Sequence, residues 1–243
     1  MQDFLVPKRS SAYGLSGLGD KLRRGIGALI CTLGLGFSVA APAETAPLRL
    51  VALGDSLTQG YGLTQGDGLV PQLEAWLQDA GHDVILINAG VSGDTTAGGL
   101  SRLDWTLADE PDAMMIALGG NDLLRGIDPA NSRANLQAIL ERLQAEDLPA
   151  LLIGLPAPGN YGPEFRDAFE AMYVELAEEY GAVRYPNLLQ PISDKHELGL
   201  SYSELMQDDR IHPSAAGVQA IVEALGPVVS DWLRQIEAED TGS

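Results

Sequence analysis

The sequence predicts an α/β fold in which helices cover both faces of a parallel sheet, a three-layer α/β/α sandwich. Three observations lead to this prediction. Five short apolar runs alternate with segments of helical periodicity, the runs are apolar at nearly every position, and the connections are short. Strands buried on both faces carry continuous apolar runs, and alternation with helices makes neighbouring strands parallel.

The five apolar runs are the expected strands. Four are rich in aliphatic residues, and the fifth is weaker. They cover residues 48–53, 84–87, 113–118, 150–155 and 182–185. In open parallel sheets, ligands bind beyond the carboxyl ends of the strands. Functional side chains are therefore expected directly after these runs.

Four segments between and after the runs have the periodicity of amphipathic helices, and their apolar side chains are expected in the core. These side chains are Leu69, Leu73, Trp76, Leu77 and Ala80; Leu136, Ile139, Leu140 and Leu143; Phe165, Phe169, Met172, Tyr173 and Leu176; and Val218, Ile221, Val222 and Leu225. The last helix is expected over residues 214–237. Gly226-Pro227 lies inside it and predicts a kink or a restart.

Residues 1–43 are expected to be a signal peptide that is removed, and residues 44–243 to form a single domain. Residues 1–24 carry five basic and two acidic side chains, residues 25–39 form an uncharged apolar run, and Ala41-Pro42-Ala43 offers small residues for cleavage. This order is typical of secretory signals. The alternative is a retained membrane anchor, for which the apolar run is short. The product is expected in the periplasm or secreted.

Cys31 is the only cysteine and lies inside this signal segment. It follows the bulky Ile30, whereas a lipoprotein signal has a small residue there, so no lipidation is expected. The mature chain would contain no disulfide. About 200 residues are enough for a core that stabilises one domain without one.

The mature chain is strongly acidic. Removing residues 1–43 leaves ten basic and 32 acidic side chains, a formal charge of −22. Such a surface repels nucleic acids and anionic membranes. We therefore expect a small-molecule substrate, no nucleic-acid partner and no stable membrane insertion once the signal is removed. The sequence does not indicate an oligomeric state.

Small polar residues and glycines follow three of the strands. These loops contain Gly54-Asp55-Ser56, residues 88–94 and residues 119–122. A glycine-bounded turn between strand and helix either cradles a phosphate or presents a nucleophile. Neither G-x-x-x-x-G-K-[ST] nor G-x-G-x-x-G occurs, which disfavours the common phosphate loops. Ser56 and Thr58 could still cup a flavin phosphate.

A nucleophilic Ser56 needs a base, and the sequence offers three histidines. His82 and His196 lie in polar stretches and are expected to be solvated loop residues. His212 follows Asp209 by three residues, so a single turn can bring the carboxylate onto its ring. Asp208 is the competing carboxylate. The G-x-S-x-G motif of α/β-hydrolases is absent.

Four blocks in this order resemble the SGNH (GDSL) hydrolase family: Gly54-Asp55-Ser56-Leu57, Gly93 within Ser-Gly-Asp-Thr, Gly119-Gly120-Asn121-Asp122, and Asp209-x-x-His212. Residues 88–103, 155–162 and 206–213 are also similar to the periplasmic acyl-CoA thioesterase/lysophospholipase and arylesterase subgroup. The resemblance covers essentially the whole mature chain. It implies a flavodoxin-like five-stranded parallel sheet and serine esterase activity.

The resemblance also implies the roles of individual residues. Ser56 would be the nucleophile, His212 the base and Asp209 the residue that orients it. The oxyanion hole would consist of the backbone N–H groups of Ser56 and Gly93 and the side-chain amide of Asn121. Asp55 and Asp122 are expected to shape the loops. Neither a metal nor a cofactor is expected.

Two loops that are unusually apolar are expected to line an acyl groove, as in the resembling subgroup. The substrate-binding residues would be Leu123, Leu124, Ile127, Leu155, Pro156 and Tyr161. Such a groove favours a lysophospholipid, acyl or aryl ester, and extends to thioesters. Three alternatives remain: a carbohydrate acetylesterase on the same fold, a non-catalytic flavin- or nucleotide-binding module, and a catalytically silent binding protein.

Overall fold

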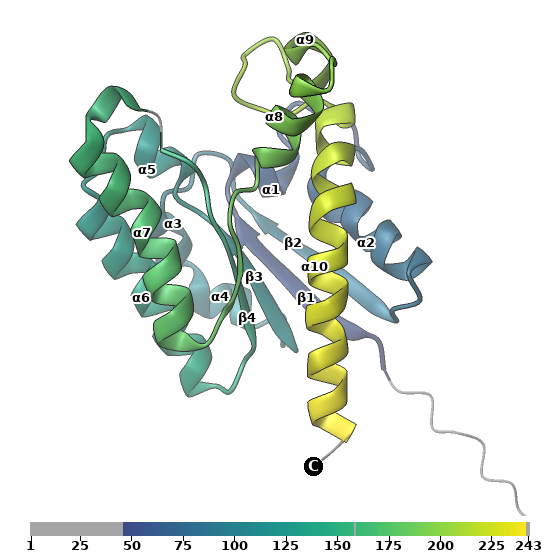
Figure 1. Cartoon of the computed structure of the whole chain (residues 1–243). Helices are drawn as coiled ribbons and strands as arrows, with labels where there is room; N and C mark the ends of the chain where they lie inside the picture. The colour runs from purple at the N-terminus through teal and green to yellow at the C-terminus, as the bar shows by residue number, and fades with distance from the viewer. Residues whose placement is uncertain (1–45, 158, 242–243) are drawn as a thin grey trace, which may run out of the picture. The chain divides into compact units, whose positions relative to one another are not determined.

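A five-stranded parallel sheet forms the centre of the computed structural model, which describes residues 46–157 and 159–241 (Figure 1). The predicted signal peptide, residues 1–43, lies outside the described residues. The strands are β1 (Leu48–Gly54), β2 (Val84–Gly90), β3 (Ala113–Ala117), β4 (Ala150–Ile153) and β5 (Val183–Tyr185). Their order is β2-β1-β3-β4-β5, the flavodoxin-like arrangement. The predicted fold class and all five strands are confirmed.

The second strand is longer than its apolar run. It pairs with β1 without a break, from Leu48 beside Val84 to Gly54 beside Gly90. The polar Asn88 is therefore part of the strand, because the neighbouring strand supplies the backbone hydrogen bonds there. The loop that carries Gly93 begins directly after this paired end, beside the end of β1.

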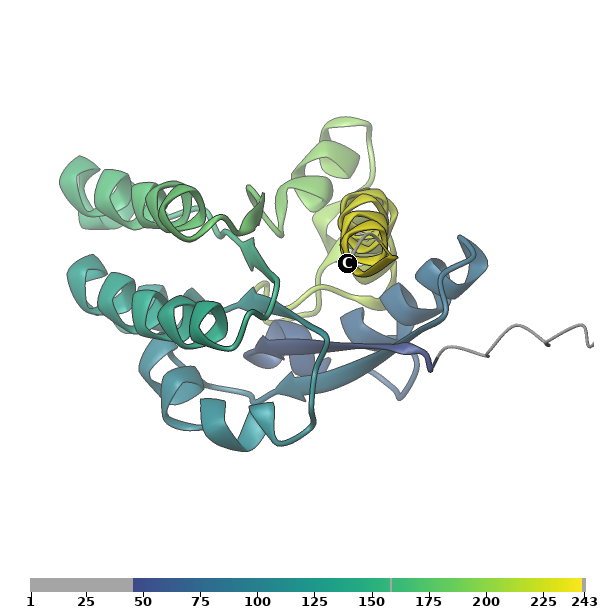
Figure 2. The ribbon, with the colours of Figure 1, turned by 90° about the horizontal axis from the view of Figure 1, so that it is seen from below.

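Helices cover both faces of the sheet, as Figures 1 and 2 show. The helices are α1 (Ser56–Gln59), α2 (Leu69–Asp79), α3 (Thr96–Ser101), α4 (Leu103–Leu107), α5 (Gly120–Leu124), α6 (Pro129–Ala145), α7 (Pro163–Tyr180), α8 (Gln190–Glu197), α9 (Tyr202–Leu205), α10 (Ala215–Thr241) and a 3₁₀ turn, η1 (Gly159–Tyr161). The helices α2 and α10 pack on one face, and α3, α4, α6 and α7 lie on the other. Among the described residues, no helix is long and apolar enough to cross a membrane.

The core fills the space between the sheet and both helix layers. Its largest side chains at under 2% exposure are Leu50, Leu53, Leu73, Leu77, Met114, Met115, Ile116, Leu118, Leu136, Ile139, Phe169 and Tyr173. Burying one large aliphatic side chain contributes about 1.5–3 kcal/mol. The predicted core helices are confirmed, except that Ala80 follows the last residue of α2 and is exposed.

The sequence predicted a kink or a restart at Gly226-Pro227. The restart is wrong, because α10 continues unbroken through both residues, whereas the kink stays a prediction. Gly226 serves close packing instead: a Cβ on it would lie 2.6 Å from the Trp76 ring of α2. Pro227 is exposed, so the carbonyl of Glu223, which loses its helical N–H partner, is on the solvent side. Helix packing therefore outweighs the local breaker signal.

His82 is not a solvated loop residue, as the sequence predicted, but is 8% exposed. Its Nε2 lies 2.7 Å from Ser230 Oγ and its Nδ1 lies 3.5 Å from Glu237 Oε1, both on α10. The C-terminal half of that helix covers the turn before β2. His196 is exposed as predicted, but it belongs to the last turn of α8 and not to a loop.

Candidate active site

Ser56 is the first residue of α1, and only Asp55 separates it from the end of β1. Asp55 caps this short helix, since its Oδ1 accepts the Leu57 N–H at 3.0 Å. Strand β1 lies between β2 and β3, where the strand order reverses. Loops leave such strands in opposite directions and open a crevice. The turn therefore presents Ser56 at the position where this fold binds ligands.

Ser56, His212 and Asp209 form a continuous hydrogen-bonded chain. The Ser56 hydroxyl lies 2.8 Å from His212 Nε2, and His212 Nδ1 lies 2.6 Å from Asp209 Oδ2. The other carboxylate oxygen of Asp209 accepts the backbone N–H groups of Ile211 and His212 at 2.9 and 3.0 Å. Asp208 makes no hydrogen bond to His212 within the described part of the chain. The structure thus brings the three predicted residues together.

The hydrogen bonds to Asp209 determine the charge of the carboxylate. The backbone N–H of His212, its ring N–H and the Ile211 N–H together lower the pKa of Asp209 to about 2. The carboxylate is therefore charged at neutral pH and accepts a hydrogen bond from the protonated Nδ1 of His212. This leaves Nε2 as the acceptor for the Ser56 hydroxyl, the tautomer that a general base requires.

The predicted oxyanion donors belong to three segments that follow β1, β2 and β3 at the carboxyl edge of the sheet. The backbone N–H groups of Ser56 and Gly93 have no acceptor among the described residues. Gly93 has φ +86°, a conformation that glycine adopts freely. Asn121 Nδ2 lies 3.3 Å from Asp55 Oδ2. One amide hydrogen of Asn121 is thus engaged by Asp55 and the second is available to a ligand.

The Asp55 carboxyl beneath Asn121 is 2% exposed. Burial raises its pKa to about 6, although the Leu57 N–H, the Asn121 amide and the charge of His212 oppose this rise. Asp55 both caps α1 and fixes the Asn121 amide. These contacts agree with the loop-shaping role expected from the sequence.

Asp55→Asn is expected to stabilise the protein at neutral pH. The unfolded chain ionises Asp55 near pH 3.8, whereas the folded protein holds the proton up to about pH 6. The stability that protonated Asp55 gives below pH 3.8 is therefore lost as the pH rises through 6, up to about 3 kcal/mol. Denaturant unfolding should show a difference between variant and wild type that is small at pH 3.5 and reaches its plateau above pH 6. The exposed Asp83→Asn is the control, and a difference that does not change with pH would contradict this account.

A second buried carboxylate ties the Asn121 loop to the neighbouring helices. Asp122 is fully buried and accepts the Thr96 N–H at 2.8 Å, the Thr96 hydroxyl at 2.6 Å and the Ser132 hydroxyl at 2.7 Å. Gly119, at φ +123°, precedes it, and a Cβ there would collide with the Tyr173 hydroxyl. Asn121 therefore projects from a loop with little freedom to move.

An arginine ties the ends of β1 and β2 together. Arg102 pairs with Asp94 at 2.6 Å and donates to the Gly54 carbonyl at 2.9 Å. Both side chains of the pair are mostly buried. The loops that carry Ser56 and Gly93 are thereby held in one arrangement.

Tyr61, Arg125 and Gln207 are among the residues around the site that were not identified from the sequence. The Tyr61 ring lies 4.6 Å from the His212 ring, and its side chain is half exposed. Arg125 donates to the Gly93 carbonyl at 2.7 Å, and Gln207 donates to the carbonyls of Tyr61 and Pro213. Each of these side chains contacts the site through a residue that is distant in the sequence. Only the position of Tyr61 near the serine block could have drawn attention to it.

A cavity of about 600 Å³, the Ser56 cavity, opens beside the nucleophile. Five predicted substrate-binding residues line it with Ser56 and Asn121: Leu123, Leu124, Leu155, Pro156 and Tyr161. The rest of its wall consists of Asp55, Leu57, Gly120, Asn160, Leu189, Met206, Arg210 and Ile211. Ile127, the sixth predicted residue, does not line it. Gly126 turns the chain at φ +62° and the Ile127 N–H bonds back to the Asp122 carbonyl, so the segment leaves the cavity before Ile127.

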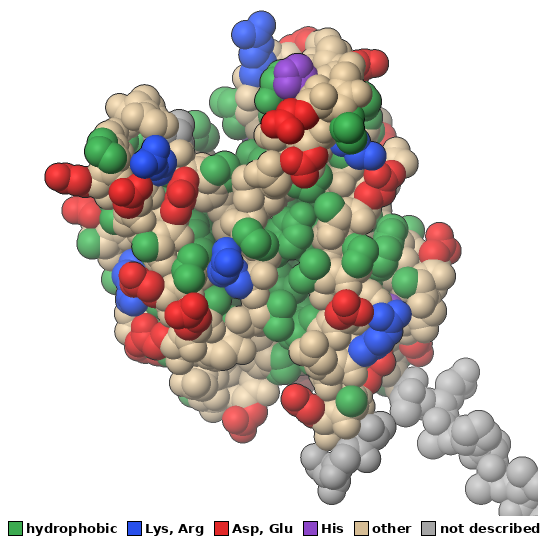
Figure 3. All heavy atoms as spheres, in the orientation of Figure 1, with side chains coloured by type: hydrophobic (Ala, Val, Ile, Leu, Met, Phe, Trp, Pro, Cys, Tyr) green, Lys and Arg blue, Asp and Glu red, His purple; other side chains and the backbone are tan. Residues whose placement is uncertain are grey.

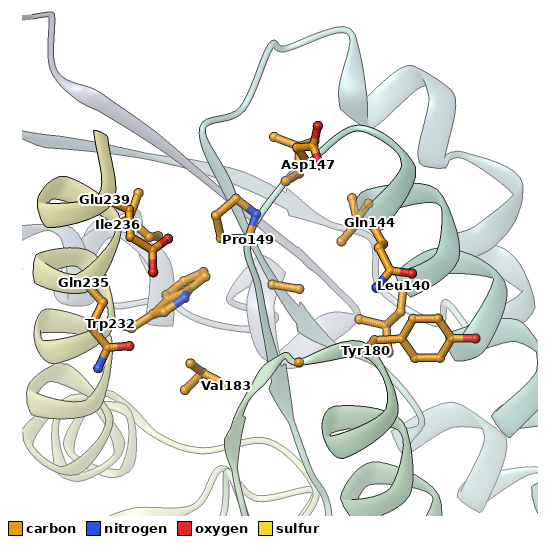
Figure 4. A pocket seen from close by; sticks show the side chains of 14 residues that line it. Leu140, Gln144, Asp147, Pro149, Tyr180, Val183, Trp232, Gln235, Ile236 and Glu239 are labelled. Carbon is orange, nitrogen blue, oxygen red and sulfur yellow. The ribbon is translucent and has the colours of Figure 1, made fainter. Parts of the chain in front are cut away.

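Another cavity, of about 310 Å³, lies at the opposite, amino-terminal edge of the sheet (Figure 4). Trp232 and Ile236 of α10 face Leu140 and Tyr180 across it. Figure 3 shows hydrophobic side chains gathered in a strip between α7 and α10, the helices that flank it. No Ser, Cys or His is among the described residues that line it. The described residues of this cavity therefore offer no serine nucleophile and no histidine base comparable to Ser56 and His212.

Known proteins match most of this chain in sequence and in fold. A model of the GDSL-like lipase/acylhydrolase family matches residues 52–220. Esterase TesA of Pseudomonas aeruginosa is 36% identical over 191 residues, which cover 78% of this chain and 92% of that protein. Thioesterase 1/protease 1/lysophospholipase L1 of Escherichia coli strain K12 is 33% identical over 196 residues, 80% of this chain and 83% of that one.

Solved structures agree with these matches. The SGNH-hydrolase family esterase AlinE4 is 42% identical with a TM-score of 0.62, covering 77% of this chain and 97% of that chain. The resemblance first inferred from the four sequence blocks is therefore confirmed by sequence and by fold. The chain belongs to the GDSL-like lipase/acylhydrolase family and is an enzyme that hydrolyses ester bonds.

Proposed function

We propose that Ser56, His212 and Asp209 hydrolyse carboxylic esters in two steps through an acyl-enzyme. The observation that carries the proposal is the aligned chain of two hydrogen bonds, 2.8 Å from Ser56 to Nε2 and 2.6 Å from Nδ1 to Asp209. A base held in this way removes the serine proton as the oxygen attacks. Every step uses side chains and backbone groups of this chain and water.

In the first step, Ser56 Oγ attacks the carbonyl carbon and its proton passes to His212 Nε2. Asp209 stabilises the imidazolium that forms. The negative charge on the former carbonyl oxygen is held by the N–H groups of Ser56 and Gly93 and by the Asn121 amide. His212 then protonates the leaving oxygen. In the second step, water deprotonated by His212 attacks the acyl-serine and releases the acid.

Asn121→Ala is expected to lower kcat by about 10²–10³-fold with a small change in KM. The amide donates to charge that develops only in the transition state, so ground-state binding changes little. Steady-state hydrolysis of p-nitrophenyl butyrate measures both constants. The exposed Asn131→Ala on α6 is the control, and a wild-type kcat in the Asn121 variant would remove Asn121 from the oxyanion hole.

The apolar wall of the Ser56 cavity supports esters with aliphatic or aryl acyl groups over polar sugar esters. Leu123, Leu155 and Met206 lie on this wall, and Leu124 and Tyr161 are exposed at it. A chain-length series of p-nitrophenyl esters should show kcat/KM rising beyond acetate. Lysophospholipid, acyl-CoA and acetylated xylan tested beside it separate the lipid, thioester and carbohydrate classes. A maximum at acetate with turnover of xylan would favour the acetylesterase alternative.

Residues 1–43 are proposed to direct export to the periplasm or beyond and to be removed. The basic segment, the apolar run and Ala41-Pro42-Ala43 support this proposal. Expression of the full chain in a Gram-negative host, followed by fractionation and N-terminal mass mapping, tests it. The expected product begins within a few residues of Glu44 in the soluble periplasmic fraction. An intact N-terminus in the membrane fraction would instead indicate a retained anchor.

A further inference from the structure

Arg210 has a backbone conformation that side chains rarely adopt. Its φ is +56°, in the left-handed region, and its N–H donates to the Gln207 carbonyl at 2.9 Å. Among the described residues other than glycine, only Glu110 and Asp147 share a positive φ, and both lie in turns away from Ser56. Glycine would adopt this turn without strain. Strained residues persist mainly where their side chains serve a function.

Arg210 lies where two cavities meet. It follows Asp209, precedes Ile211-His212, and lines the Ser56 cavity. It also lines a second cavity of about 600 Å³ beneath α8 and α9. The two cavities share Pro156, Leu189, Met206 and Arg210 as their common wall. A molecule that extends from the Ser56 cavity into the second cavity therefore passes Arg210 on this wall.

The guanidinium of Arg210 is exposed and has no ion-pair partner among the described residues, although the chain is strongly acidic. Its neighbour Asp209 is engaged by His212, and Asp208, which also lines the second cavity, forms no ion pair with it. Arg102, Arg133 and Arg142 pair with carboxylates. Arg49, Arg125 and Arg184 also form no ion pair within the described residues, but of the four unpaired arginines only Arg210 lines the Ser56 cavity. A guanidinium binds carboxylate and phosphate groups through two parallel hydrogen bonds.

The chemistry of the proposed reaction indicates which part of the substrate meets Arg210. His212 protonates the leaving oxygen, so the loop that carries it faces the alcohol portion of the ester. Arg210 belongs to that loop. The second cavity presents hydroxyl and amide groups from Ser193, Tyr202, Ser203 and Gln207 beside the apolar side chains of Pro156, Leu189, Ile192 and Met206. Its wall therefore suits a group with both polar and apolar parts.

From these observations, we infer that Arg210 is a specificity residue that binds a phosphate or carboxylate on the alcohol portion of the ester. The second cavity holds the remainder of that portion. This inference rests on the proposed function. It assigns the enzyme a preference for esters with an anionic leaving group over neutral esters with the same acyl chain.

The test uses pairs of esters that share the acyl chain and differ in whether the alcohol portion carries an anionic group. The carboxylate arm compares the hexanoate esters of 4-hydroxybenzoate and 4-hydroxybenzamide, and the phosphate arm compares lysophosphatidate with monoacylglycerol of the same chain. Wild type should prefer the anionic member in at least one arm, and the arm that responds identifies the group recognised. Arg210→Gln and Arg210→Gly should lower the ratio of anionic to neutral kcat/KM by about tenfold, mainly through KM, and added salt should lower it in wild type.

The stability of the variants separates recognition from damage to the fold. Arg210→Gly should raise the melting temperature by about 2–4 °C because it relieves the strained turn. Glu110→Gly relieves a similar turn elsewhere and should raise the melting temperature without changing the ratio. An enzyme that hydrolyses the neutral esters but shows the same ratio in wild type and in both Arg210 variants would overturn the inference and leave the proposed function standing. Absence of hydrolysis of any ester by wild type would overturn the proposed function itself.

Discussion

Replacing Ser56 with alanine is expected to lower kcat for p-nitrophenyl butyrate by roughly 10⁴–10⁶-fold, the range for loss of a serine nucleophile. The proposed acyl-enzyme cannot form without this hydroxyl, whereas the oxyanion donors and the cavity remain. The only side-chain hydrogen bond of Ser56 is the one to His212, at 2.8 Å, within the described part of the chain. The melting temperature should therefore stay close to that of wild type.

Steady-state kinetics on freshly purified protein, with a circular dichroism melt of each sample, measures both expectations. Ser101→Ala is the matched control, because its hydroxyl donates to the Gly98 carbonyl on α3, outside the site. Turnover by folded Ser56→Ala within tenfold of wild type would contradict the nucleophile assignment.

The second large effect is expected from Asp209→Asn, which should lower kcat by about 10⁴-fold. An asparagine amide facing Nδ1 would favour the tautomer with its proton on Nε2. That nitrogen could then no longer accept the Ser56 proton. Because the pKa of Asp209 is about 2, the wild-type carboxylate is charged throughout neutral pH, and titration of Asp209 should not contribute to the defect between pH 6 and pH 9.

Asp208→Asn provides the comparison, since Asp208 was the competing carboxylate in the sequence. It makes no hydrogen bond to His212 among the described residues, so this variant should retain most of the wild-type kcat. A larger loss in the Asp208 variant than in the Asp209 variant would reverse the assignment. Both variants should be measured over the same pH series in the same buffers, so that buffer effects cancel in the comparison.

The parts of the fold predicted from the sequence are those in which local pattern and burial agree. The continuous apolar runs of β1 and β3 are buried on both faces, and no other element competes for them. The three blocks that follow strands could be placed at one sheet edge because parallel strands end together. The triad contact followed from the three-residue spacing of Asp209 and His212, which a single turn closes.

The predictions that were wrong concern residues whose surroundings come from distant parts of the chain. His82 is buried only because α10 covers the turn before β2, about 150 residues later in the sequence. Gly226 accommodates the Trp76 ring, so a local helix-breaking signal is overridden by packing. Ile127 was predicted to bind substrate because its loop is apolar, but the positive φ of Gly126 directs the chain away from the Ser56 cavity. Likewise, no sequence pattern predicted the left-handed (αL) backbone conformation of Arg210, because arginine rarely adopts it.

The central claim is that Ser56 carries the acyl group, and covalent labelling tests it most directly. The enzyme is incubated with an alkyl fluorophosphonate, which adds to an activated serine, and the intact mass and residual activity are followed together. The account predicts one adduct per chain, mapped to the peptide containing Ser56, that forms in step with the loss of activity and is absent from Ser56→Ala. Complete inactivation with the adduct on another residue, or equal labelling of Ser56→Ala, would contradict it.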